Sequence, residues 1–402
     1  MALVLTLWVL AAMIVLAAGL GAMVRTEAQI SRIFADIIRC RWAARAGENR
    51  GLTQVQKLAS QPNTYFEERA LRFTSEDDGV ELADAAYEVT IDDEAARVNI
   101  NVASRRVLQE LFGSREIADC IIDWRDEDDQ PQPLGAETQY YAGERTPYRC
   151  KNAPFDTVRE LLLVKGVTRE MLETPVTEDD LALEELLTVC SRDPNVTVEG
   201  KQRLNIQTAD RGKLKAELGD VLTDQDFDAI IRYRDGSAGG SKTPQPPGAR
   251  QRQRPDRRVR TVRGRRFQTA ADITRVPGLS REKVAKIYDR LTCSEAKVRV
   301  GRINVNTAPV EVLASLPGIG RSTAEEIVDY RSRTGGFPDV GALLNVKALS
   351  DRDFRRCADL LTARSRVFRI VSTGRLARTA GTIVCVADAT DGKSPQIRYW
   401  RE

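Results

Sequence analysis

The N-terminus of the chain is a long run of apolar residues. No residue from Ala2 to Val24 is charged. An α-helix rises 1.5 Å per residue, so roughly 20 apolar residues cross the hydrocarbon core of a bilayer. A cleaved signal peptide would begin with a basic segment and carry a shorter apolar core. The run therefore predicts a transmembrane helix.

The helical pattern continues beyond this run. Apolar residues recur at three- and four-residue spacing, namely at Ile30, Ile33, Phe34, Ile37 and Ile38. Gly47 and Gly51 are the first residues expected to break the pattern. We expect one continuous helix of about 45 to 55 residues, with its first half in lipid and its second half packed on the soluble body. The alternative is a plain signal anchor followed by a separate helix.

Two other stretches, 87–91 and 367–371, alternate in a way that predicts β-strands flanking the helices. The chain ends in further strand-like runs at 382–387 and 397–400. Strands therefore flank a long central region whose pattern is mainly helical.

That central region repeats itself three times. Three landmarks of each copy are a strand-like start at 97–103, 203–209 and 302–308, a helix end at 121–126, 230–235 and 327–332, and a phenylalanine at Phe155, Phe267 and Phe337. Landmarks that stay in register across three copies indicate repeated structural units. Each copy is expected to form a short strand, an Asn-rich turn, and three or four helices.

The Asn and Thr residues of the turns are interpreted as helix caps and not as a site. In the third copy, Asn306 or Thr307 would cap the next helix, and Pro309 would occupy its first turn.

The predicted fold is α+β, with a long N-terminal transmembrane and amphipathic helix and a strand-bearing head. Helical repeats resembling SAM and helix-hairpin-helix units are inserted into this head. The predicted segments are a transmembrane segment (1–24), an amphipathic helix continuing into the head (25–60), strands of the head (61–96), the three repeat units (97–202, 203–301 and 302–366) and C-terminal strands (367–402).

Composition narrows the functions available to this fold. The chain has 402 residues, a formal net charge of +3 and no histidine. Its length fits two or three domains. Without histidine there are no His general bases, triads or His-ligated metal sites. The seven cysteines form no CxxC pair, which argues against a thiolate cluster, and an odd count leaves at least one thiol free. No nucleophile with a partner base is found, so we expect no enzyme.

An acidic segment follows the first long helix of the first repeat. Its candidate metal ligands are Asp123, Asp126, Asp128 and Glu137. Calcium takes six to eight oxygen ligands from a flexible loop, and like charges packed together without a cation repel one another. The spacing is not that of an EF-hand, and a solvated acidic loop is the equal alternative.

The third repeat contains a candidate helix-hairpin-helix. Its turn holds Gly318 and Gly320, and Arg321 opens the following helix. In such motifs backbone N–H groups at a helix N-terminus can contact a DNA phosphate. The other two copies lack the second glycine, which favours a purely structural hairpin.

The second copy carries a basic, Pro-rich insertion over 237–266. Its residues 242–266 hold ten basic residues against the single Asp256. We expect a disordered, solvated tether, with contact to anionic lipid, polysaccharide or nucleic acid as the alternative.

Longer motifs in the chain resemble one known family. These motifs are Met1–Leu5, Ile91–Ala103, Asp123–Asp126 with Gly135–Glu137 and Tyr141, Tyr148–Phe155 and Leu161–Val167. Together they resemble the general secretion pathway protein K family, the minor pseudopilins of type II secretion systems. The resemblance covers residues 1 to about 170 and about 300 to 402.

This resemblance implies a structural role at a membrane and a pilin-like head, with pilin-like strands over 61–96. It implies a single-pass protein of the bacterial inner membrane with a periplasmic body, which starts pseudopilus assembly with minor pseudopilins of the I and J type. Most pseudopilins carry a glutamate at mature position 5, whereas Leu5 here suits a tip subunit with nothing above it. The resemblance also implies calcium in the acidic loop.

Two departures from the family and one alternative remain. No prepilin leader is visible before Met1, so either the start is mature or another start codon is used. The middle copy is unusual for the family. The alternative function is a membrane-anchored helix-hairpin-helix DNA receptor of the competence type, although nucleic acid is not the expected partner.

Overall fold

The computed structural model describes residues 2–61, 71–80, 82, 84–175, 181–235, 267–392 and 394–402. It divides the chain into two compact units. The anchor unit comprises the described residues of 1–60, 66–92 and 368–402, and the repeat unit comprises those of 93–367. The basic insertion predicted at 237–266 lies outside the described residues. The mixed α+β fold expected from the sequence is confirmed.

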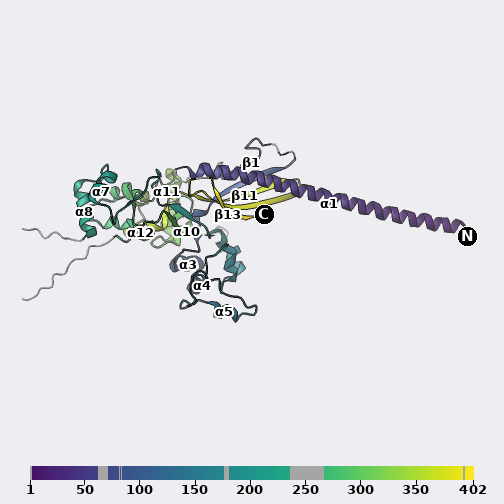
Figure 1. Cartoon of the computed structure of the whole chain (residues 1–402), viewed down its shortest axis with the longest axis horizontal. Coiled ribbons are helices and arrows are strands. Elements are labelled where there is room, and N and C mark those ends of the chain that lie inside the picture. Colours follow the sequence, from purple (N-terminus) through teal and green to yellow (C-terminus); the bar gives the residue numbers. More distant parts are fainter. Residues whose placement is uncertain are drawn as a thin grey trace, which may run out of the picture. The chain divides into compact units, whose positions relative to one another are not determined.

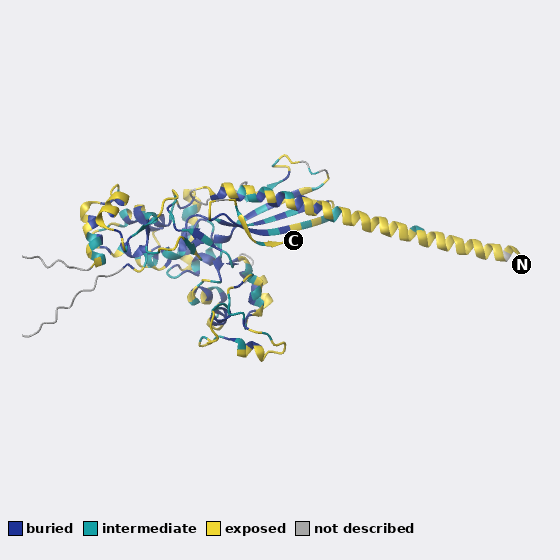
Figure 2. Cartoon of the chain, in the orientation of Figure 1, coloured by how far each residue is buried: buried dark blue, intermediate teal, exposed yellow. Residues whose placement is uncertain are grey.

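The anchor unit is built on one long helix, α1 (Ala2–Ala59), of 58 residues. Its N-terminal part projects beyond the sheet and is exposed along its length (Figures 1 and 2). It is long and apolar enough to cross a membrane. The expected apolar anchor helix is therefore present and is continuous with the helix of the head.

The C-terminal part of α1 lies against a five-stranded sheet in the order β1-β2-β11-β12-β13. The strands are β1 (Arg72–Thr74), β2 (Ala86–Asp93), β11 (Val367–Leu376), β12 (Thr379–Asp388) and β13 (Gln396–Arg401). Antiparallel pairing joins β1 to β2 and β12 to β13. Alternate strand residues face α1, so Val89, Ile91, Phe368 and Ile370 bury their side chains with Val55 and Leu58 of the helix.

The two glycines expected to break the helix do not break it. Gly47 and Gly51 lie inside α1 where its backbone approaches the sheet. A Cβ atom on Gly51 would be 2.7 Å from Cγ2 of Ile370. The missing side chains therefore allow close packing, and the helix runs on to Ala59.

The apolar stripe on α1 is not packed on the body as predicted. Ile33, Phe34 and Ile38 are 55%, 61% and 51% exposed, and burial of the helix begins at Cys40. Trp42, two residues further on, is 70% exposed. The stripe thus continues the exposed apolar surface of the N-terminal part of α1 toward the sheet.

Three runs of helices and short strands follow one another in the repeat unit. The first comprises η1 (Glu94–Ala96), β3 (Val98–Asn99), α3 (Arg105–Phe112), α4 (Arg115–Arg125), α5 (Thr138–Ala142), η2 (Val158–Leu163), α6 (Arg169–Glu173), η3 (Leu183–Glu185) and β4 (Leu187–Thr188). The second comprises β6 (Leu204–Asn205), α7 (Arg211–Leu218), α8 (Asp224–Asp235), η4 (Ala270–Arg275), α9 (Arg281–Ile287), η5 (Tyr288–Arg290) and β7 (Leu291–Thr292). The third comprises β9 (Ile303–Asn304), α10 (Val310–Ala314), α11 (Arg321–Thr334), η6 (Val340–Asn345), α12 (Asp351–Cys357), η7 (Ala358–Leu360) and β10 (Leu361–Thr362).

Each copy is closed by a two-residue parallel ladder between its first and last strands. The pairs are β3 with β4, β6 with β7, and β9 with β10. The closing strand is Leu-Thr in all three copies. A parallel pair needs a long connection, and here the helices of each copy supply it.

A half-buried arginine holds the start of each copy in place. Arg331 donates hydrogen bonds to the carbonyl oxygens of Val305 and Ala308 at 2.8 and 2.7 Å. Arg234 and Arg125 make the equivalent pairs of bonds, to Ile206 and Ala209 and to Ile100 and Ala103. One guanidinium therefore satisfies two carbonyl groups of the turn in every copy.

The Asn-rich turns are not helix caps, contrary to the prediction. Asn306 donates to the carbonyls of Phe337 and Ala363 and accepts from the N–H of Phe337 at 2.7 Å. Thr307 donates to the Asp93 carboxylate. The N-cap of α10 is Pro309, without a side-chain cap. Both side chains bond to residues distant in the sequence because the turn is enclosed by the rest of its copy.

The second and third copies also interlock. Arg281 of α9 donates to the carbonyls of Leu344 and Leu349, both at 2.6 Å, and pairs with Asp351. A short antiparallel pair, β5 (Arg192–Pro194) with β8 (Val298–Val300), joins the segments that follow the first and second copies. The middle copy is therefore an integral part of the repeat unit.

Candidate functional site

The acidic loop begins where α4 ends. Ser114 caps the N-terminus of α4 by accepting from the N–H of Ile117. The helix ends at Arg125, and its C-cap Asp126 donates its N–H to the carbonyl of Ile122. An apolar face of α4 that includes Ile121 and Trp124 is buried in the core. The loop that follows therefore leaves a firmly packed helix and returns to it at Glu137.

Asp123 shapes this loop from within. Its carboxylate is fully buried and accepts from the N–H of Gln132 at 3.0 Å. Gly135 lies against it, since a Cβ there would be 2.6 Å from Cγ of Asp123. Burial, more than the nearby charges, raises the pKa of Asp123 to about 6. Asp123 thus accepts hydrogen bonds from the loop backbone. It is not part of the group formed by Asp126, Asp128 and Glu137.

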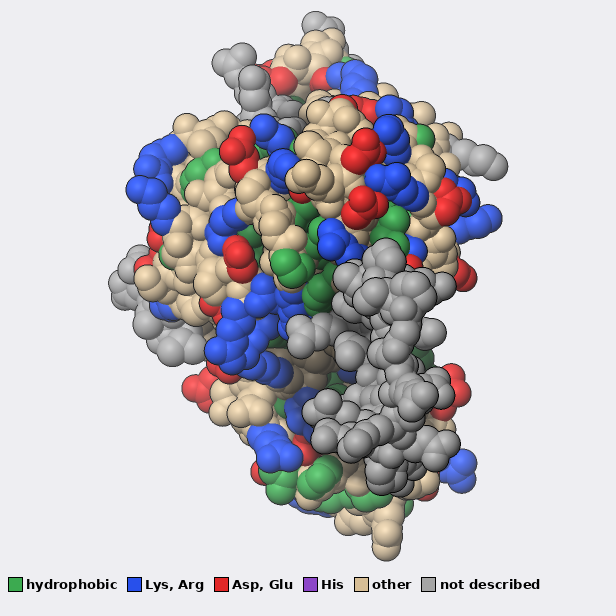
Figure 3. Space-filling view, turned by 90° about the vertical axis from the view of Figure 1, so that its left-hand side faces the viewer, with side chains coloured by type: hydrophobic (Ala, Val, Ile, Leu, Met, Phe, Trp, Pro, Cys, Tyr) green, Lys and Arg blue, Asp and Glu red, His purple; other side chains and the backbone are tan. Residues whose placement is uncertain are grey.

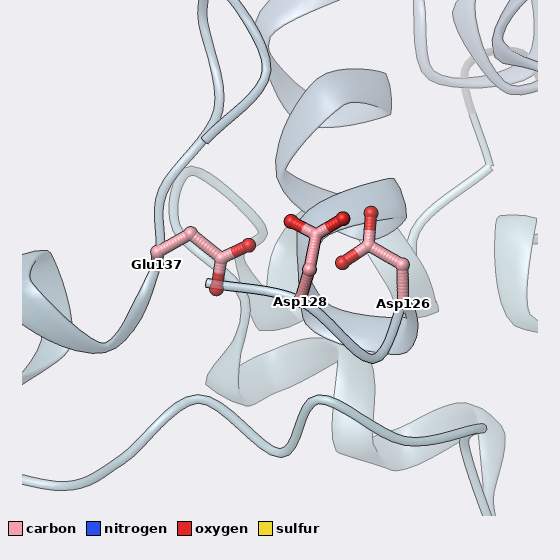
Figure 4. A group of neighbouring side chains, drawn as sticks. All are labelled: Asp126, Asp128 and Glu137. Atoms are coloured by element: carbon pink, nitrogen blue, oxygen red, sulfur yellow. The ribbon is translucent and has the colours of Figure 1, made fainter. Parts of the chain in front are cut away.

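The other three predicted ligands lie together. One oxygen from each of Asp126, Asp128 and Glu137 lies within 4.8 Å of the others. Figure 4 shows their side chains meeting from the two ends of the loop. Asn152, on a neighbouring segment, donates a hydrogen bond to the carbonyl of Asp128 at 2.6 Å. This bond holds the loop at Asp128. Three of the four residues singled out from the sequence are therefore brought together.

These carboxylates are held in an unfavourable state without a cation. At such distances two unit charges repel by roughly 3 to 4 kcal/mol at an effective dielectric constant of 20. Burial, followed by the charge of Asp123, raises the pKa of Glu137 to about 7. Burial and the charge of Asp128 also raise the pKa of Asp126.

The donor set fits a hard cation. Both oxygens of Glu137 and Oδ1 of Asp126 are buried without a hydrogen-bond partner among the described residues. Buried polar atoms are normally satisfied, so unsatisfied carboxylate oxygens that converge are consistent with a ligand. The side chains that would hold it offer oxygen, as calcium prefers.

The hairpin of the third copy joins α10 to α11. Gly318 has φ +90°, and a Cβ there would lie 3.0 Å from Cα of Asp353. Gly320 is the exposed N-cap of α11, and Arg321 points its exposed side chain toward Glu325 at 3.4 Å. The predicted residues Gly318, Gly320 and Arg321 therefore form a true helix-hairpin-helix turn.

The corresponding turns of the other copies differ. Gly113 has a left-handed φ of +63°. Gly219, at the same place in the second copy, has φ −68°. Asp220, beside it, is paired with Arg290 at 2.7 Å. Two matched glycine hairpins, which would favour a DNA-binding pair, are absent from the described residues.

The membrane end of α1 carries the last predicted positions. Leu5 is 69% exposed, and Met1 lies outside the described residues. Elsewhere the visible surface is mixed. In Figure 3, Lys and Arg side chains are interspersed with Asp and Glu, apart from one compact cluster of Lys and Arg. The formal net charge of +3 agrees with this balance.

Two protein-family models match the chain. Residues 82–174, which include the acidic loop, match the model described as type II secretion system, protein K. Residues 298–362, the third copy, match the helix-hairpin-helix motif.

Curated relatives match only short segments. ComE operon protein 1 of Bacillus subtilis is 31% identical over 62 residues, which is 15% of this chain and 30% of that protein. Endonuclease/exonuclease/phosphatase family domain-containing protein 1 of Danio rerio is 43% identical over 56 residues, which is 14% of this chain and 10% of that protein. This chain therefore spans less than a third of the length of either relative.

One solved structure aligns along most of the chain. It belongs to the GspK-GspI-GspJ complex from the type 2 secretion system of enterotoxigenic Escherichia coli. The alignment covers 94% of this chain and 98% of that chain, with a TM-score of 0.46 and 12% sequence identity.

Proposed function

We propose that this chain, a member of the type II secretion system protein K family by its residues 82–174, serves as a minor pseudopilin at the tip of a pseudopilus. The family match carries this proposal, because it contains the acidic loop and the strand that enters the repeat unit. The role is structural and involves no catalysis.

The form of α1 supports the proposal. A helix of 58 residues with an exposed apolar first half suits a single-pass anchor in a bacterial inner membrane, with the body in the periplasm. Leu5 carries no charge that would require a partner subunit above it. Position at the tip follows from this residue and from the family resemblance.

The proposed partners are minor pseudopilins of the I and J type. The stripe of Ile30, Ile33, Phe34 and Ile38 is exposed, although its spacing is that of a buried helix face. Helices of sister subunits that run beside α1 would cover it. With these partners the chain would start pseudopilus assembly for protein export.

Calcium is the proposed cofactor. Asp126, Asp128 and Glu137 would hold the ion, with Asp123 fixing the loop around it. A bound cation would offset the mutual repulsion of these carboxylates and stabilise the first repeat.

A DNA receptor of the competence type is the second candidate. The helix-hairpin-helix match and the likeness to ComE operon protein 1 favour it. Against it, Glu311 and Asp353 lie near the third-copy hairpin, where their charges would repel a phosphate. Paired glycine hairpins are also missing from the described part of the chain.

Secretion itself tests the proposal. In a host strain that lacks its own gene for this chain, expression of the full chain should restore export of a type II substrate. A variant with Gly318 and Gly320 both changed to alanine distinguishes the pseudopilin from the DNA receptor. The receptor is favoured if the intact chain does not restore export and if DNA uptake is lost in this variant.

A further inference from the structure

A network of arginine and aspartate side chains lies where the segments between the copies meet. Asp193, in β5 after the first copy, pairs with Arg302 at the start of the third copy and with Arg364 near its end, at 3.4 and 3.1 Å. Asp359 pairs with Arg299 of β8 at 2.6 Å and with Arg302 at 3.7 Å. Each aspartate is shared by two arginines, so three guanidinium groups meet only two carboxylates.

The start of the second copy adds an ion pair and brings a free donor. Arg203 pairs with Asp289 at 2.6 Å. The Nε atoms of Arg203 and Arg302 are both buried, and neither has a hydrogen-bond partner among the described residues. Arg302 itself is only 6% exposed. Buried polar groups are normally satisfied, so two unsatisfied N–H donors indicate that a ligand accepts from them.

The two free donors belong to guanidinium groups that act on the same tyrosine. Tyr288 is buried, and its hydroxyl makes no hydrogen bond within the described ranges of the chain. Burial raises the pKa of Tyr288, whereas the charges of Arg302, Arg203 and Arg299 lower it. Burial also lowers the pKa of Arg302 to about 10; Asp193 opposes this shift, and Arg299 and Arg203 add to it. These side chains therefore surround Tyr288 closely enough for their charges to be felt.

The charge of this region stays positive when the neighbouring acids are counted. Arg366 adds a fifth arginine, has no ion-pair partner in the described part of the chain, and lies near Arg364, whose charge helps burial to lower the pKa of Arg366. Asp339 adds a fourth aspartate, and burial raises its pKa to about 6. Asp93 forms no ion pair with these described arginines and accepts from neutral donors such as Asn304. Five arginines therefore face four aspartates, which leaves room for one negative charge.

We propose that a small monovalent anion of the chloride type binds between Nε of Arg203 and Nε of Arg302, beside the hydroxyl of Tyr288. Both guanidinium groups can donate these N–H groups without giving up their aspartate partners. The anion offsets the excess of arginine and links the start of the second copy to the start of the third. This inference concerns the repeat unit alone, so it can fail or hold independently of the proposed function.

The test measures chloride binding to the full chain in detergent, after exchange into potassium gluconate. Chloride is added at constant ionic strength, with empty micelles as background. We expect the chlorine NMR line to broaden beyond that of the micelles, and bromide to reverse the broadening because it displaces chloride. The melting temperature should rise with chloride and then level off, since the anion binds only the folded state.

Two variants locate the site. Arg203→Lys keeps the charge opposite Asp289 but lacks the Nε donor, so chloride affinity should fall at least about tenfold. Tyr288→Phe removes only the hydroxyl and should weaken binding at least about threefold. Arg211→Lys, exposed in the same copy, should bind chloride as the parent chain does.

The proposal is overturned if the chlorine line is no broader than with empty micelles, which would leave water as the partner of the two donors. It is also overturned if Arg203→Lys binds chloride as tightly as the parent chain. Should Arg203→Lys fail to fold in gluconate, unchanged chloride affinity in Tyr288→Phe overturns it instead.

Discussion

The Oδ2 atom of Asp93 accepts a hydrogen bond from Nδ2 of Asn304 at 2.8 Å, although 211 residues separate them in the chain. Thr307 and Ser365 donate to the same carboxylate, and so does the N–H of Ala95. One buried acid at the entrance of the first copy thus binds both ends of the third. Burial raises the pKa of Asp93, and its donors act in the opposite direction.

Removing this acid should destabilise the repeat unit. Asp93→Ala leaves several buried donors without an acceptor, and we expect a loss of about 3 kcal/mol in the free energy of unfolding. Urea denaturation of the full chain in detergent measures it. Asp391→Ala, at an exposed position, is the control and should change stability by less than about 0.5 kcal/mol. Equal effects would show that Asp93 does not join the copies.

The arginine that holds each turn should not tolerate lysine. Arg331→Lys keeps the charge but cannot reach both the Val305 and Ala308 carbonyls, so we expect a loss of about 1 to 2 kcal/mol. Arg333→Lys, exposed on the same helix, is the matched control. Urea denaturation measures the loss. If Arg331→Lys leaves the free energy of unfolding unchanged, the guanidinium does not determine the stability of the copy.

Calcium should stabilise the chain more at pH 8 than at pH 5.5. The pKa of Glu137 is raised from 4.5 to about 7, so its protonated form stabilises the metal-free fold below pH 4.5. This contribution is lost as the pH rises through 7, where the ionised carboxylates can bind the cation. The melting temperature with and without calcium, at both pH values, measures the effect.

Two variants control the calcium experiment. Glu137→Gln should abolish most of the calcium-dependent rise in melting temperature. Glu127→Gln, exposed in the same loop but outside the carboxylate group, should preserve it. The proposed calcium site is contradicted if the calcium-dependent rise in melting temperature is the same at both pH values or persists in Glu137→Gln.

The exposed stripe on α1 should matter for assembly and not for folding. Phe34→Asp and Ile38→Asp place a charge on the surface proposed to meet sister helices, so export should fall by at least about tenfold. Because these side chains are exposed in the isolated chain, its melting temperature should hardly change. Arg32→Gln, on another face of the helix, is the control. Full export by both stripe variants would contradict the proposed helix contacts.

The sequence predicted the elements that depend on local pattern. The uncharged run from Ala2 to Val24 and the three aligned copies were both evident from it. The two-residue strands that close the copies, such as Leu187–Thr188, have no periodicity, and they were missed. A shared Leu-Thr at the end of each copy was the one signal that would have revealed them.

Features that depend on distant partners could not be predicted. Asn306 bonds to Phe337 and Ala363, so its local sequence suggested a cap that the fold does not use. The spacing of Ile33 and Ile38 indicates a face to be buried, but it does not say whether this chain or another covers it. Asp123 is close in sequence to the three proposed metal ligands, but its buried carboxylate accepts a hydrogen bond from the loop backbone at Gln132.

Co-purification tests the central claim most directly. The full chain is expressed with candidate I and J pseudopilins in one membrane, extracted in mild detergent and separated by size. The account predicts a stable complex of all three that Phe34→Asp and Ile38→Asp dissociate and that excess duplex DNA leaves intact. A chain that migrates alone, and that binds duplex DNA tightly at physiological salt through Gly318 and Gly320, would contradict it.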